Sequence, residues 1–173
     1  MSGISNSGLS AEKYYMQITG ASKSKNKVDG DFCFGDDNGE IKEAVETINQ
    51  VRAVKYIPLV VYNSKDNAWY VVPPNVIVNL VSKKKRGQHT ENQFECATLS
   101  INKISAYQVV ENNLKQETLN AIEEGRKHPE LKIMMQNILA DCKNMASKHT
   151  KQVSQLIDII GETKINIGIY NSY

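Results

Sequence analysis

The sequence has few of the features that mark zinc proteins, membrane proteins or strongly basic nucleic-acid binders. Its three cysteines, Cys33, Cys96 and Cys142, are odd in number and widely spaced, which excludes a zinc-like pairing and predicts a reducing compartment. The formal net charge is only +2, so any contact with nucleic acid must come from local basic patches. No apolar run approaches the roughly 20 residues of a membrane span, and the first residues lack the apolar core of a signal peptide. We therefore expect a cytoplasmic protein without membrane contact.

The composition is that of an ordinary globular domain. Of the 173 residues, 40% are apolar and 23% are charged, which is enough for one domain with a complete hydrophobic core. We expect an α/β (α+β) fold in which residues 1–112 form a central mixed β-sheet flanked by helices. Residues 113–173 would form a helical extension that packs on this core or serves dimerisation, within one structural domain overall.

Residues 10–101 alternate between helix and strand signals. Ser10 suits the N-cap of a short helix, and Pro73 and Pro74 suit the start of another. The apolar spacing after Thr47 predicts a helix, and the nearly all-apolar segment 57–62 predicts a buried strand. The expected helices are 11–18, 48–55 and 75–82, and the expected strands are 28–34, 39–45, 57–62, 68–72 and 94–101.

From Asn113 onward the pattern becomes helical. Apolar residues at helical spacing predict helices over about 114–126, from Pro129 to about Met145, and over 150–160 with Gly161 just past the end. The segment 164–170 is predicted as a closing edge strand. The apolar stripes alone leave open whether these helices cover the core or bind a partner.

A tight turn at residues 35–39 separates Asp31 from the tripeptide Glu40-Ile41-Lys42. Alternation along a strand places Glu40 and Lys42 on the same side. If the turn is centred between residues 36 and 37, Asp31 lies opposite Lys42 and diagonal to Glu40. Two converging carboxylates suit Mg²⁺, which takes oxygen ligands and keeps several waters. The lysine would position or deprotonate a water beside the metal.

The acid, the hairpin and the Glu-X-Lys strand are similar to the core of the PD-(D/E)XK nucleases, which have the restriction-endonuclease-like fold. The matching segments are 30–32 and 40–42, and the resemblance continues through 47–62, 69–74 and 86–94, where it is most like a type II restriction endonuclease. The resemblance implies a Mg²⁺-dependent endodeoxyribonuclease that hydrolyses phosphodiester bonds of double-stranded DNA, with Mn²⁺ able to substitute, and a homodimer. It implies Asp31 and Glu40 as catalytic metal ligands and Lys42 as the catalytic lysine.

Several alternatives stay open. Gly30 stands where the family has proline, which leaves Asp29 as a rival for the first carboxylate. Glu43 would replace Glu40 if the strand register slipped by one residue. Gln50 is a possible accessory residue. The tripeptide is also compatible with an exposed edge strand, so a repair, junction-resolving or homing nuclease, or a non-catalytic DNA- or protein-binding module, remains an alternative function.

Basic and polar side chains around the hairpin are candidates for DNA contact. Basic groups follow phosphates with salt-dependent affinity, and polar groups of the loop 86–93 have the side-chain types that contact base edges. The basic run 83–86 is equally compatible with a solvated helix end, where cations interact favourably with the helix dipole. The DNA-binding candidates are Lys23, Lys25, Arg52, Lys55, Lys83, Lys84, Lys85, Arg86, Gln88 and His89.

Overall fold

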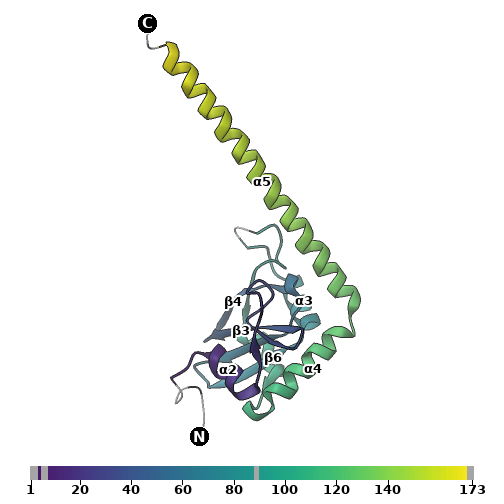
Figure 1. Ribbon diagram of the computed structural model, residues 1–173. Helices are drawn as coiled ribbons and strands as arrows, with labels where there is room; N and C mark the ends of the chain where they lie inside the picture. Colours follow the sequence, from purple (N-terminus) through teal and green to yellow (C-terminus); the bar gives the residue numbers. More distant parts are fainter. Residues whose placement is uncertain (1–3, 5–7, 88–89, 171–173) are drawn as a thin grey trace. The chain divides into compact units, whose positions relative to one another are not determined.

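The computed structural model describes residues 4, 8–87 and 90–170, with side chains described as far as residue 158. The chain divides into two compact units, Met1–Gln136 and Asn137–Tyr173. The first unit is a mixed α/β structure that contains all the strands of the described residues (Figure 1). The second unit consists of the greater part of a single long helix.

The strands form a main sheet and a smaller one. The main sheet has six strands in the order β1-β2-β3-β5-β6-β8, and β4 pairs with β7. Strands β3 and β5 are parallel, whereas the other neighbours are antiparallel, so the main sheet is mixed, as expected. The strands are β1 Ser22–Lys23, β2 Phe32–Phe34, β3 Asp37–Ala44, β4 Thr47–Val51, β5 Leu59–Asn63, β6 Ala68–Val72, β7 Ala97–Ser100 and β8 Gln108–Val109.

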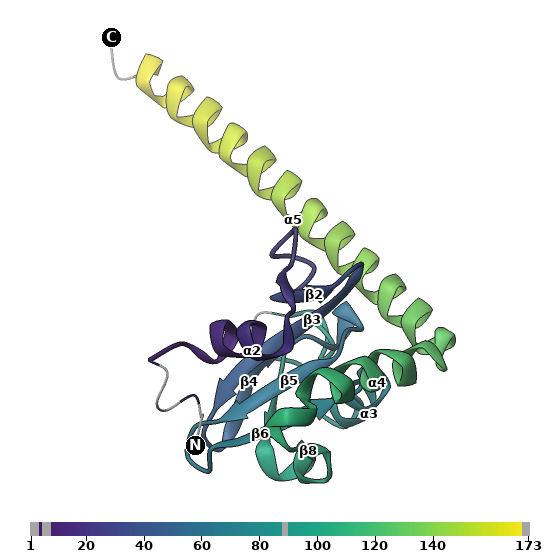
Figure 2. The same cartoon turned by 60° about the horizontal axis from the view of Figure 1, so that its bottom comes forward.

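Helices cover the main sheet on both faces. The α-helices are α2 Ala11–Thr19, α3 Pro74–Ser82, α4 Leu114–Arg126 and α5 Pro129–Tyr170, and the short 3-10 helices are η1 Ala53–Lys55, η2 Ile101–Tyr107 and η3 Glu111–Asn113. On one face, α2 and α4 share a core with the sheet that includes Tyr15, Phe32, Trp69 and Leu114 (Figure 2). The opposite face of β3 and β5 meets Ile77 of α3 and residues of β4, and this face carries the candidate site.

Elements with strong local signals are confirmed. Ser10 Oγ accepts a hydrogen bond from the Lys13 N–H at the start of α2, as its capping role predicts. Strand β6 and helix α4 have the predicted bounds, and α3 begins at Pro74, where the missing N–H of proline is not needed. Strand β5 is buried along its whole length, as its apolar sequence indicates.

The helix predicted over 48–55 is wrong. Residues 47–51 form β4 instead, because Ile48 pairs with Leu99 of β7, and both side chains are fully buried. The ladder has a bulge before Val51, where Gln50 takes a positive φ of 54°. Because of this bulge, apolar residues that are three apart in the sequence are buried on the same side of the strand. The apolar spacing that suggested a helix therefore also fits a bulged strand.

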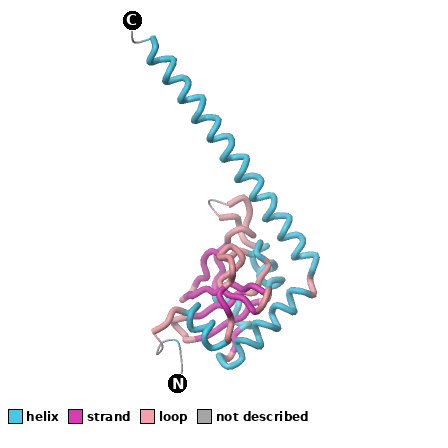
Figure 3. The backbone as a smooth tube through the Cα atoms, viewed as in Figure 1, coloured by secondary structure: helices cyan, strands magenta, loops and turns pink. Residues whose placement is uncertain are grey.

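The end of the chain also differs from expectation. Helix α5 is continuous from Pro129 to Tyr170, so the break at Gly161 and the edge strand over 164–170 are wrong (Figure 3). An interior glycine costs a helix only about 1 kcal/mol relative to alanine, and no proline follows Pro129 to end the helix.

Candidate functional site

The β2–β3 hairpin places Asp31 beside Glu40. Its register pairs Phe32 with Gly39 and Phe34 with Asp37, so partner numbers sum to 71 and Asp31 extends the ladder opposite Glu40. The predicted position opposite Lys42 is therefore wrong. The reason is the turn, which is centred one residue earlier because Gly35 takes the left-handed conformation (φ 62°) at its first central position.

The carboxylate of Asp31 is anchored to the backbone of the motif strand. The Ile41 N–H donates to Asp31 Oδ2 at 2.9 Å, and the Asp31 N–H donates to the Gly39 carbonyl at 2.9 Å. The Ile41 N–H belongs to the peptide group that joins Glu40 to Ile41, so the Asp31 carboxylate lies next to the Glu40-Ile41-Lys42 segment. Its other oxygen has no hydrogen-bond partner among the described residues.

Two glycines allow the hairpin to close this tightly. A Cβ atom on Gly30 would lie 2.6 Å from the Gly39 carbonyl oxygen. A Cβ atom on Gly39 would lie 2.2 Å from the ring of Phe32. Packing thus explains the glycine at position 30, because a side chain there would displace β3 from Asp31.

Glu40 lies between two lysines. Its Oε1 is 3.0 Å from Lys42 Nζ, and its Oε2 is 2.7 Å from Lys55 Nζ. The side chains of Glu40, Lys42 and Lys55 are only 14%, 25% and 12% exposed. Strand alternation turns Ile41 to the opposite face, where it joins the core under α2. Burial raises the pKa of Glu40, but the hydrogen bonds and charges of Lys55 and Lys42 outweigh burial and keep this pKa below its ordinary value.

Lys55 reaches Glu40 because of the backbone at Tyr56. This residue takes the left-handed conformation (φ 50°) between η1 and β5, which costs a non-glycine residue about 1–2 kcal/mol. Its hydroxyl hydrogen bonds the carbonyl oxygens of Gly125 at 2.9 Å and His128 at 3.1 Å, which fixes the turn to the end of α4. Burial, and to a lesser degree the charge of Glu130, raises the pKa of Tyr56. The segment that connects β3 to the parallel strand β5 thereby places Lys55 beside Glu40.

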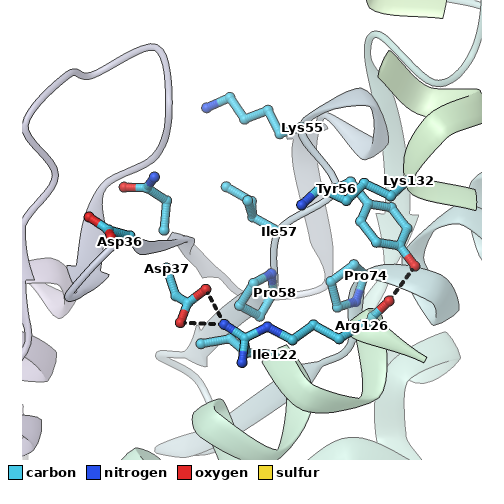
Figure 4. A pocket seen from close by; sticks show the side chains of 12 residues that line it. Asp36, Asp37, Lys55, Tyr56, Ile57, Pro58, Pro74, Ile122, Arg126 and Lys132 are labelled. Carbon is cyan, nitrogen blue, oxygen red and sulfur yellow. Dashed lines mark hydrogen bonds and ion pairs between the residues drawn. The ribbon is translucent and has the colours of Figure 1, made fainter. Parts of the chain in front are cut away.

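Two spaces of different size border Lys55. The smaller, lined by Glu40 and Lys42 among others, has a volume of about 10 Å³ and has room for no more than about one water or ion. The larger is a cavity of about 220 Å³ between the hairpin turn, Tyr56 and α4. Figure 4 shows Asp36 at one side of this cavity, and Arg126, which binds both carboxylate oxygens of Asp37, at another.

The residues present fit a Mg²⁺ ion that completes its coordination with water and substrate oxygens. In the described part of the chain, no group of three or more His, Cys, Asp or Glu side chains could hold a metal, so a closed protein cage is not formed. Mg²⁺ is usually bound by one or two carboxylates together with waters and phosphates. Asp31 and Glu40 are two carboxylates at neighbouring positions of the hairpin, and a carboxylate oxygen that accepts one hydrogen bond keeps a second lone pair.

The alternative site residues lie elsewhere. Asp29 is exposed in a turn over residues 27–29, and Glu43 is exposed on the face of β3 opposite to Glu40. Gln50 is exposed on strand β4 rather than on the expected helix. Arg52 lines the small space beside Glu40, and its Nε–H donates to the Glu95 carbonyl at 3.3 Å.

The other predicted DNA contacts are at the surface or outside the described residues. Lys23 and Lys25 are exposed on and after β1, next to the hairpin. The run Lys83, Lys84, Lys85 and Arg86 is exposed just after α3. Gln88 and His89 lie outside the described residues.

The engagement of Lys55 with Glu40 was missed by sequence reasoning, which proposed Lys55 only as a DNA contact. Its position depends on a crossover and on the conformation of Tyr56, and neither leaves a signal in the spacing of residues.

Comparison of the chain with protein-family models, curated proteins and solved structures finds no match. Among the described helices, none is both long and apolar enough to cross a membrane.

Proposed function

We propose that this chain is a Mg²⁺-dependent endodeoxyribonuclease of the PD-(D/E)XK type, and specifically a type II restriction endonuclease of the cytoplasm. The observation that supports the proposal best is the contact of 3.0 Å between Glu40 and Lys42 in a largely buried position on β3. The same strand donates its Ile41 N–H to the carboxylate of Asp31. Asp31 and the Glu40–Lys42 pair therefore lie at neighbouring positions of one hairpin, which supports this proposal.

Asp31 and Glu40 would hold the cation. When bound, a divalent cation polarises the phosphate and lowers the pKa of a coordinated water. Lys42 is the most exposed of the three charged side chains around Glu40, so its ammonium group is best placed to orient a water and to offset negative charge on the phosphate. The largely buried surroundings strengthen these electrostatic interactions relative to water.

The exposed cations would bind the DNA backbone. Lys23 and Lys25 adjoin the hairpin, and the run 83–86 follows α3, whose Ile77 borders the site. Contacts of this kind give affinity that falls steeply with salt and depends little on sequence. Replacement of the four basic residues of the run by glutamine is expected to weaken DNA binding and to flatten its salt dependence.

Cleavage of plasmid DNA tests the proposal. Purified protein is incubated with supercoiled plasmid in Mg²⁺, in Mn²⁺ and in EDTA. We expect discrete fragments with either metal and none with EDTA. Glu40→Gln should abolish cleavage and leave DNA binding in EDTA nearly unchanged. Glu46→Gln, which alters an exposed carboxylate, serves as the matched control. Unchanged cleavage by the Glu40 variant would exclude the assigned site.

The same experiment separates the rival functions. A junction-resolving enzyme would cut branched DNA in preference to linear duplex, and a repair or homing nuclease would give few or lesion-dependent cuts in plasmid. A non-catalytic binding module is favoured by one observation, namely that both oxygens of Glu40 are bound by lysines. DNA retention without cleavage under every metal condition would favour that module.

A homodimer would let two sites cut two strands. In the C-terminal unit, Val153, Leu156 and Ile157 lie on one side of α5 and are each more than half exposed. We propose that this stripe forms the dimer contact. Light scattering with and without DNA should give the mass of a dimer, and Leu156→Glu should give a monomer. A monomeric wild-type chain under both conditions would remove the proposal.

A further inference from the structure

Lys55 makes the shortest contact to the candidate metal ligand. Its ammonium nitrogen is 2.7 Å from Glu40 Oε2, and both side chains are less than 15% exposed. Lysine at such a position is seldom the most stabilising choice, because removing two charges from water offsets most of their attraction. A role in the chemistry of the site is a better reason for its presence.

Charge balance indicates what that role is. Without a cation, the two carboxylates of Asp31 and Glu40 are matched by the two ammonium groups of Lys42 and Lys55, so the net charge of the four groups is zero. A divalent cation added to this set would raise the net charge to +2. The arrangement therefore favours departure of one ammonium group when the cation binds.

The structure gives Lys55 a place to go. Its side chain borders both the space of about 10 Å³ beside Glu40 and the adjoining cavity of about 220 Å³. That cavity is also lined by Asp36, which has no ion-pair partner among the described residues (Figure 4). The four-carbon stem of lysine is flexible, whereas the backbone at Tyr56 is fixed by its hydrogen bonds to the end of α4. The ammonium group can thus move without a change of fold.

We propose that Lys55 is a positioning residue that holds the Glu40 carboxylate while no metal is bound, and that a divalent cation displaces its ammonium group into the neighbouring cavity. The inference rests on the proposed function, since it assumes that Glu40 binds a cation. Lys42, which contacts the other oxygen of Glu40, stays in place beside the substrate.

Direct measurement of Mn²⁺ binding tests the displacement. The free Mn²⁺ signal in electron paramagnetic resonance is titrated at pH 7.5 against the wild type, Lys55→Met and Lys65→Met. Lys65 is the matched control, because its ion pair with Glu46 is 3.9 Å long and exposed. We expect Lys55→Met to bind Mn²⁺ about tenfold more tightly than wild type, the factor that corresponds to one hydrogen bond to a charged group. The Lys65 variant should bind as wild type does. Equal or weaker affinity of a folded Lys55 variant would overturn the inference.

A second readout uses the wild-type chain, so it does not depend on a variant that folds. Lysine acylation followed by mass spectrometry should show Lys55 reacting several-fold faster when Mg²⁺ is added, with Lys65 unchanged. No change at Lys55 in a chain that binds Mn²⁺ would overturn the displacement alone. Absence of Mn²⁺ binding in the wild type and in Lys55→Met would overturn the proposed metal site together with it.

Discussion

Glu40→Gln should destabilise the fold, although Glu40 is a candidate catalytic residue. Its carboxylate contacts Lys55 at 2.7 Å and Lys42 at 3.0 Å, and these three side chains are 12–25% exposed. Glutamine would leave two largely buried ammonium groups without a counter-charge. Because the site is not fully buried, we expect a loss of about 2–3 kcal/mol in the free energy of unfolding, below the cost of breaking a fully buried ion pair.

Glu46→Gln provides the comparison at the surface. Glu46 and Lys65 are 3.9 Å apart, with side chains 79% and 62% exposed, so solvent screens their attraction. The loss there should stay within about 0.5 kcal/mol. Urea denaturation at neutral pH and without metal, followed by circular dichroism, measures both variants. Similar losses for the two variants would refute the reasoning that burial makes the Glu40 pairs important.

Three further outcomes are expected from the same assay. Lys55 and Lys42 outweigh burial and lower the pKa of Glu40 on folding. The stability difference between wild type and Glu40→Gln should therefore be constant above about pH 4.3 and should shrink as the pH falls through the folded-state pKa, and a difference that does not change with pH would contradict this. Gly39→Ala should cost about 3 kcal/mol or more, because its Cβ would overlap the ring of Phe32, and a loss below 1 kcal/mol would mean that the hairpin relaxes freely. Tyr56→Phe should cost about 1 kcal/mol by removing the hydroxyl that hydrogen bonds two carbonyls at the end of α4, and unchanged stability would argue against that anchor.

The helices and strands that depend on a few neighbouring residues were predicted correctly from the sequence. The Ser10 cap, the proline at the start of α3 and the all-apolar β5 each act within a few residues, and these elements lie where the sequence placed them. The segment 48–55 failed because its apolar spacing fits both a helix and a bulged strand. The pairing of Ile48 with Leu99, about fifty residues later, decides between them, and single-sequence patterns do not contain that information.

The site shows the same division between local and distant causes. Alternation was enough to predict that Glu40 and Lys42 share a face, because this follows from strand geometry alone. The register was missed because it depends on which residue of the turn takes positive φ, and the segment 35–39 contains two glycines, either of which can take that conformation. Lys55 was outside the reach of pattern reasoning, since its place depends on a parallel crossover.

The burial of the charged group favours a chemical role over a structural one. A carboxylate that only contacts solvent would be exposed, as Glu43 is on the opposite face of β3. Glu40 instead lies among apolar neighbours, with Leu59 beside it in the sheet and Ile77 across from it. Apolar side chains in place of Glu40, Lys42 and Lys55 together would satisfy packing without the cost of desolvating three charges. Since stability alone would be served as well by an apolar set in place of all three charged groups, the charged set is better explained by the cation site proposed above than by stability.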